Sequence, residues 1–121
     1  MKSNEKPAIL LVGRDTTLHY LFNRFAEQSG YQLAGNREHV SVEEIEAVKP
    51  AAILFLSTEL LAKNQRLVAD LASHESPIIV CSSTAEEARA RELGADYCLL
   101  HPLTFNDFQT ALEMISISKR I

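Results

Sequence analysis

The residues of this sequence that could carry out chemistry stand at the ends of short apolar runs. The candidates are Arg14, Asp15, Ser57, Ser82 and His101. In an open parallel sheet, ligands and reacting groups lie just past the carboxyl ends of the strands, so these side chains are expected along one rim. Asp15 could give a cation one oxygen ligand, and Ser57 could accept phosphate.

Structural roles are the competing interpretation for the same residues. Asp15 or Thr16 is expected to cap the helix that follows, since such side chains accept bonds from open N–H groups. Ser57 and Thr58 are expected to cap another helix in the same way. The histidines are His19, His39, His74 and His101. They share no ligand spacing, so no metal site is predicted. Gly13 belongs to no glycine-rich phosphate loop, which makes nucleotide binding a weak signal.

Composition limits the class of protein. The chain has 121 residues, 46% of them hydrophobic, and a single domain is expected over residues 1–121 with a flexible N-terminus over residues 1–7. The formal net charge is −4 and no basic cluster is present, which argues against a nucleic acid or a membrane as the partner. Cys81 and Cys98 form no CxxC pair, which favours buried thiols in a reducing cytoplasm. No signal peptide or membrane span is predicted.

Strands and helices must alternate to position the candidate residues. Apolar runs predict strands over residues 8–12, 31–35, 52–56, 77–82 and 96–100. Helical patterns lie between them, which is typical of βαβ units and a parallel sheet. The second and fifth runs include polar residues and are expected at the edges, because central strands are apolar on both faces. With right-handed crossovers these features predict the sheet order 2-1-3-4-5.

The helix boundaries are expected from capping signals and apolar spacing. Capping boxes at residues 41–44 and 84–87 predict two helix starts, and the second of these helices is expected to end at Gly94. A single helix is expected over residues 60–71. The residues expected to point inward from the helix after 41 are Val42, Ile45 and Val48. The residues expected to form the buried stripe of the last helix are Phe105, Phe108, Leu112 and Ile115.

Four sequence blocks carry a resemblance to a known family. They are LLVGRD, KPAAILFLS, PIIVCSS and GADYCLLHP, in this order along the chain. Over nearly its full length, the chain resembles the CheY-like receiver domain of bacterial response regulators. The resemblance implies an α/β fold of the flavodoxin-like (βα)5 type, a three-layer sandwich around a five-stranded parallel sheet.

The resemblance also implies a phosphorylation pocket, from which this chain departs. The family's magnesium-binding acid pair falls on Gly13 and Arg14, and its phosphoacceptor aspartate falls on Leu56. The family's Thr or Ser is kept as Ser82. Its lysine falls on His101.

Two further family features fall near the fifth predicted strand. The proline after the family's lysine is kept as Pro102, and the family pattern implies a cis bond between His101 and Pro102. The family's switch aromatic falls on Cys98. Tyr97 is one place away and is expected to point to the opposite face of the strand.

These departures remove the expected chemistry. Leu56 offers no nucleophilic oxygen, Arg14 repels a divalent cation, and Asp15 alone is a single carboxylate. Leu56 is expected instead to pack against Val12 and Val80 from the neighbouring strands. The sequence therefore predicts a pseudo-receiver that is not an enzyme and uses no cofactor.

The function expected is two-component-type signal transduction through phosphorylation-independent contacts with a protein partner. Receiver domains meet partners mainly through their fourth helix, fifth strand and fifth helix, which correspond here to residues 84–94, 96–100 and 105 onward. The candidate interaction surface, which could also form a homodimer, consists of Tyr97, Met114, Ile117 and Ile121. A wider core stripe is the alternative for the three residues of the last helix.

Two other interpretations stay open. A flavodoxin-like domain could bind a small anion or cofactor at the carboxyl rim, for example between Arg14 and His101. The lack of a Cys-His set, a Ser-His-Asp set or a glycine-rich cradle stands against it. A degenerate receiver could also be phosphorylated on another residue, such as Ser57.

Overall fold

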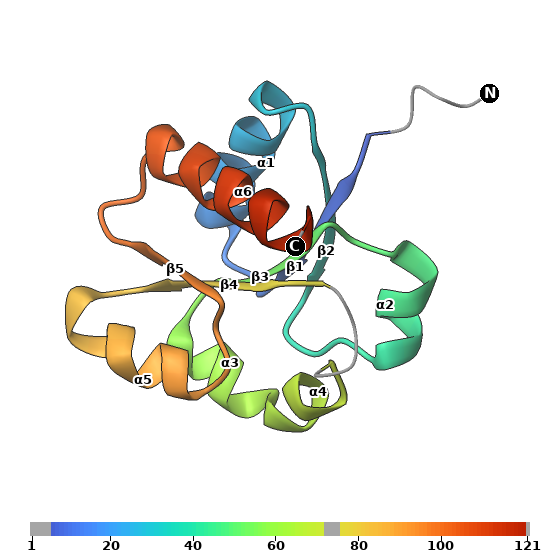
Figure 1. Ribbon diagram of the computed structural model, residues 1–121, viewed down its shortest axis with the longest axis vertical. Helices are drawn as coiled ribbons and strands as arrows, with labels where there is room; N and C mark the ends of the chain where they lie inside the picture. The colour runs from blue at the N-terminus through green and yellow to red at the C-terminus, as the bar shows by residue number, and fades with distance from the viewer. Residues whose placement is uncertain (1–5, 72–75, 121) are drawn as a thin grey trace.

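The strands form one parallel sheet, and its order confirms the sequence prediction. The computed structural model describes residues 6–71 and 76–120. The strands are β1 Ala8–Val12, β2 Gln32–Arg37, β3 Ala52–Phe55, β4 Ile78–Ser82 and β5 Tyr97–Leu100. They are ordered β2-β1-β3-β4-β5, and every neighbouring pair is parallel. Helices cover both faces of the sheet (Figure 1), so the fold is a three-layer α/β sandwich.

One face of the sheet is covered by α1 (Thr16–Gln28) and α6 (Phe105–Arg120). Four rings of these helices contact one another with centroid separations from 5.5 to 6.0 Å. They are Phe22, Phe25, Phe105 and Phe108. Phe108, Leu112 and Ile115 are buried and Phe105 is half-buried, which confirms the stripe expected on the last helix.

In the described part of the chain, four short α-helices cover the other face. They are α2 (Val42–Val48), α3 (Thr58–Lys63), α4 (Gln65–Asp70) and α5 (Glu87–Glu92). Side chains of the central strands alternate between the two cores: Leu54 faces α1 and α6, whereas Ile53 and Phe55 face the short helices. Every residue of β3 is buried, as expected for a central strand of a parallel sheet.

The edge strand β2 runs two residues further than the sequence predicts. Its expected end is residue 35, but the strand continues to Arg37. Between Leu10 and Val12 of β1 the register shifts, so that the partners of these two residues are Ala34 and Arg37. Gly35, with φ +83°, lies in this bulge, where a residue is left over on one strand. The bulge brings Arg37 level with Val12, at the carboxyl rim.

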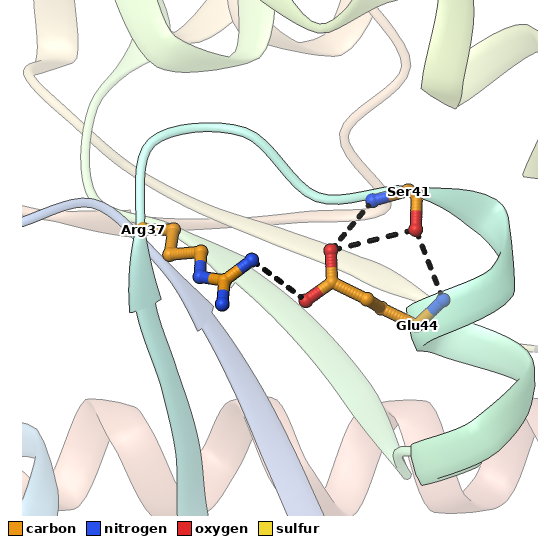
Figure 2. Close-up of polar contacts among 3 residues, drawn as sticks. All are labelled: Arg37, Ser41 and Glu44. Carbon is orange, nitrogen blue, oxygen red and sulfur yellow. Dashed lines mark hydrogen bonds and ion pairs between the residues drawn. The ribbon is translucent and has the colours of Figure 1, made fainter.

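The capping box at the start of α2 is confirmed. Glu44 N donates to Ser41 Oγ, and Ser41 N donates to Glu44 Oε1, both at 3.1 Å (Figure 2). Ile45 is buried as expected, but Val48 is 39% exposed, so its expected inward position is wrong. Three residues turn a helix by about 300°, so each step of three drifts about 60° around the helix. Val48 lies two such steps from Val42, so it no longer faces the sheet.

The helix expected over residues 60–71 is in fact two helices, which corrects that prediction at Asn64. Asn64 ends α3 and precedes α4, with φ −114° and ψ 30°. Its Nδ2 donates to Leu60 O at 2.8 Å and to Glu38 O at 3.2 Å. An asparagine amide that bonds to backbone carbonyls competes with the helical ladder. The bond to Glu38 O also connects the break between α3 and α4 to the loop after β2.

The second predicted capping box, at Thr84 and Glu87, does not form, so that prediction is wrong. The first turn, Thr84–Glu86, is a 3-10 helix, and Ser83 ahead of it makes no side-chain capping bond. Glu87 N donates to Thr84 O, so Thr84 lies inside the first turn rather than ahead of it. The predicted C-terminal end of this helix is confirmed, because α5 is capped by Leu93, directly before Gly94.

The expected flexible N-terminus covers residues 1–7, and residues 1–5 lie outside the described part. Lys6 O accepts a bond from Gln32 Nε2 at 2.9 Å, and Pro7 O accepts one from Gln32 N at 3.0 Å. Over residues 6–71 and 76–120, no helix has both the length and the apolar character needed to cross a membrane.

Candidate functional site

The carboxyl ends of adjacent strands bring the predicted pocket residues together. Val12 of β1 pairs with Phe55 of β3, and Leu56 N donates to Val12 O at 3.0 Å. Gly13 and Leu56 are therefore neighbours across the two strands. Further along the same rim, His101 N donates to Ser82 O at 3.2 Å.

Leu56 fills the space that a side chain at position 13 would need. A Cβ placed on Gly13 would lie 2.6 Å from Leu56 Cδ1, 2.8 Å from Cγ and 3.0 Å from Cβ. Real Cβ atoms essentially never approach other heavy atoms below 3.0 Å. Gly13 also has φ +140°, a conformation that L residues rarely adopt. Gly13 and Leu56, the two residues expected to depart from the family pattern, thus lie so close that no side-chain atom fits between them.

Leu56 lies on the α1–α6 side of the sheet, so the prediction that it packs against Val12 and Val80 is wrong. It is 5% exposed and belongs to the core that also holds Leu54 and Phe22. Val12 and Val80 belong to the opposite core. Side chains alternate along a strand, and Leu56 keeps the phase of Leu54.

Asp15 and Ser57 act as helix caps. Asp15 Oδ1 accepts a bond from Leu18 N at 2.9 Å at the start of α1. Ser57 Oγ accepts a bond from Leu60 N at 3.1 Å at the start of α3. Both side chains satisfy open N–H groups, as the structural interpretation of the sequence predicts.

Ser82, His101 and Pro102 lie where β4 and β5 end. Ser82 is buried at the end of β4, and its Oγ donates to Ser83 O at 2.8 Å. The His101–Pro102 bond is cis, as expected. The imidazole of His101 is exposed to solvent.

Cys98 on β5, the expected switch position, carries a buried thiol. Cys98 faces the core beside α5, while Tyr97 packs against the core beside α6, so the two point to opposite faces as expected. Burial raises the pKa of Cys98, Arg91 nearby lowers it, and Glu87 raises it again. Burial also raises the pKa of Cys81 to about 12. Both thiols are thus poor nucleophiles at neutral pH.

The candidate interaction surface is described only in part. Met114 on α6 is 50% exposed, whereas Tyr97 is half-buried against the core. The side chain of Ile117 and the whole of Ile121 lie outside the part of the chain that the structure describes.

An open pocket of about 560 Å³ lies at the β2 end of the rim. Its lining residues are Arg14, Thr16, His19 and Arg37. His101 does not line it, so this pocket differs from the one expected between Arg14 and His101. The sequence reasoning missed Arg37, and the signal that could have found it is Gly35, whose backbone freedom permits the bulge that carries Arg37 to the rim.

No protein-family model and no curated protein matches this sequence. Solved structures do match its fold. A CheY-like response regulator receiver domain protein from Methanospirillum hungatei has a TM-score of 0.70 at 19% identity, over 96% of this chain and 98% of its own. The receiver domain of the sensor histidine kinase PA1611 from Pseudomonas aeruginosa, solved with a coordinated magnesium ion, has a TM-score of 0.73 at 18% identity, over 92% and 98%. NtrX from Brucella abortus has a TM-score of 0.76 at 15% identity, over 95% of this chain and 27% of its own.

At these identities the likeness establishes the fold. The chain has the flavodoxin-like fold of CheY-like receiver domains, with a five-stranded parallel sheet in the order 2-1-3-4-5.

The rim residues do not suit a magnesium ion of the kind that receiver domains bind. Gly13 offers no side-chain ligand, Arg14 carries the wrong charge, and the apolar side chain of Leu56 occupies the space beside Gly13. Asp15, the nearest carboxylate in sequence, bonds to the N-terminus of α1. Within the described ranges, no three His, Cys, Asp or Glu side chains group as a metal ion would require.

Proposed function

We propose that this chain is a pseudo-receiver, a signalling module of two-component type that acts through contacts with a protein partner and without aspartyl phosphorylation. The receiver fold supports the class of protein. The proposal includes a single domain over residues 1–121, a cytoplasmic location, and neither enzymatic activity nor a cofactor.

The observation that carries the proposal is the contact between Leu56 and Gly13. Phosphoryl transfer to a receiver needs a nucleophilic oxygen and a cation held by carboxylates. At the end of β3 this chain has a leucine, whose side chain occupies the space that an acid at position 13 would need. An acid at position 13 alone would clash with Leu56, and an aspartate at position 56 alone would still lack a carboxylate at position 13, so neither change by itself would restore the pocket.

The remaining hydroxyl groups of the rim support the same conclusion. Ser57 Oγ holds the first turn of α3, and Ser82 is buried with its hydroxyl bonded to the backbone. These contacts favour structural roles over a substitute phosphorylation site.

The partner surface that we propose is formed by α5, β5 and α6. Met114 supplies an exposed apolar side chain there, and the sequence adds Ile117, Ile121 and the half-buried Tyr97. The net charge of −4 supports a protein partner over a nucleic acid or an anionic membrane. A homodimer through the same surface is part of the proposal.

A phosphorylation assay with a matched control tests the proposal. The wild-type chain, a Ser57→Ala variant and a receiver domain that retains its aspartate are incubated with acetyl phosphate and magnesium, then separated on a phosphate-affinity gel. We expect only the control receiver to be retarded. Retardation of the wild-type chain but not of Ser57→Ala would show that Ser57 is an acceptor, and retardation of both would contradict the proposal outright.

A further inference from the structure

Positive charge is concentrated in the pocket beside β2. Two arginines, a histidine and a threonine line it, and none of these described lining residues is acidic. The chain as a whole carries a formal charge of −4. A basic concave site on an acidic protein attracts anions to that place in preference to the rest of the surface.

The backbone holds the lining residues in place. Gly13 N donates to Arg37 O at 2.7 Å, so the chain segments that carry Arg14 and Arg37 lie side by side. Thr16 and His19 are three residues apart on α1 and therefore share one face of that helix. Arg37 thus reaches the pocket from the end of β2, whereas Thr16 and His19 reach it from α1.

The two guanidinium groups keep free donors. Arg14 is exposed and has no ion pair or side-chain hydrogen bond with any other described residue. Arg37 pairs with Glu44 Oε2 at 3.5 Å (Figure 2), but its side chain is 68% exposed. Glu44 Oε1 is engaged by Ser41, so the carboxylate orients Arg37 through one nitrogen and leaves the other donors of its guanidinium available.

We propose that this pocket binds a small organic phosphate through its phosphate group, with Arg14 and Arg37 as the charged ligands. Guanidinium groups match phosphate oxygens through paired N–H donors, and the Thr16 hydroxyl and His19 imidazole add further donors. The pocket of about 560 Å³ is open to solvent and has more room than an inorganic ion fills, so it can accommodate an organic group beside the phosphate. This site is separate from the position of the family's phosphoacceptor, which Leu56 fills, and gives the module an input that needs no phosphoryl transfer.

An amide NMR titration with adenosine 5′-monophosphate as the probe tests this site. We expect saturable shifts at the amides of residues 14–19 and 37, and no saturable shift with adenosine. Inorganic phosphate should shift the same amides with weaker affinity. Arg14→Gln and Arg37→Gln should each weaken binding at least tenfold. The matched control is Arg66→Gln on α4, which removes the same charge from an exposed site on the other face and should change the affinity less than twofold.

Several results would overturn the proposal. They are no saturation with the monophosphate, saturation at amides outside the pocket, equal binding of adenosine, or an equal loss in Arg66→Gln. Sedimentation with vesicles that contain phosphatidic acid separates a free ligand from a lipid headgroup. Binding to those vesicles without binding of the monophosphate would overturn the assignment to a small organic phosphate. All three substituted arginines are exposed, so the variants are expected to retain the wild-type amide spectrum away from the substituted residue.

Discussion

The contact between Gly13 and Leu56 can be tested with a double-mutant cycle. The cycle consists of Gly13→Ala, Leu56→Ala and the double variant. The free energy of unfolding is measured by urea denaturation followed by circular dichroism. A second glycine, Gly30, serves as the matched control, because its φ is +82° and, apart from its chain neighbours, no heavy atom of the described residues lies within 4 Å of the place where its Cβ would be.

The geometry sets the expected magnitudes. Gly30→Ala should lower the free energy of unfolding by about 1 kcal/mol, the cost of a positive φ alone. Gly13→Ala adds approaches of 2.6 and 2.8 Å to Leu56 Cδ1 and Cγ, so we expect a total cost of about 3 kcal/mol. Leu56→Ala truncates a buried leucine at a strand end and should cost about 2 to 3 kcal/mol.

In the double variant the two closest approaches disappear, because Leu56 Cδ1 and Cγ are gone. Its destabilisation should therefore be smaller than the sum of the single effects by about 1 to 2 kcal/mol. Additivity within about 0.5 kcal/mol, the usual result for independent sites, would refute the proposed filling of the pocket. A Gly13→Ala variant no less stable than Gly30→Ala would refute it as well.

Three further predictions concern the cap, the thiol and the exposed surface. Asp15→Ala should lower the free energy of unfolding by about 1 kcal/mol, because Leu18 N loses its acceptor, and Asp15→Asn should restore most of it; equal stability of Asp15→Ala and wild type in urea would contradict the cap. Burial raises the pKa of Cys81 from 9.0 to about 12, so the stability contributed by the neutral thiol is complete below pH 9 and is lost as the pH rises toward 12. In Cys81→Ala the free energy of unfolding should therefore fall less steeply between pH 9 and pH 12. An unchanged slope would contradict the raised pKa of Cys81. Met114 is 50% exposed, so Met114→Glu should lower the apparent mass in sedimentation without lowering the melting temperature, whereas a monomeric wild type at high concentration would contradict a dimer through this surface.

The fold could be predicted because local and global signals agree. The apolar runs of the central strands are uninterrupted and those of the edge strands are not, which gives the sheet order without any structural information. The stripe on α6 has helical spacing and is buried for the same reason. The break at Asn64 escaped prediction, since one of the carbonyls that its amide contacts belongs to Glu38, which is distant in sequence.

The members of the rim could be predicted, but their geometry could not. The sequence places Gly13 and Leu56 at the ends of neighbouring strands, yet the face that Leu56 takes depends on strand alternation continuing past the last residue of β3. Arg37 reaches the rim only because of the bulge at Gly35, which inserts a residue into an edge strand. Polar residues of an edge strand carry no apolar pattern from which such a shift could be deduced.

An amide NMR titration of the wild-type chain with magnesium, followed by beryllofluoride, tests the central claim most directly. The claim is that Leu56 and Gly13 leave neither a metal site nor a phosphoacceptor at the carboxyl rim. A receiver domain that retains its aspartate serves as the positive control and should show saturating shifts. For this chain we predict no saturating shift at Gly13, Arg14, Leu56 or Ser82 with either reagent. Saturation at these amides with millimolar magnesium, or a further change with beryllofluoride, would contradict the account.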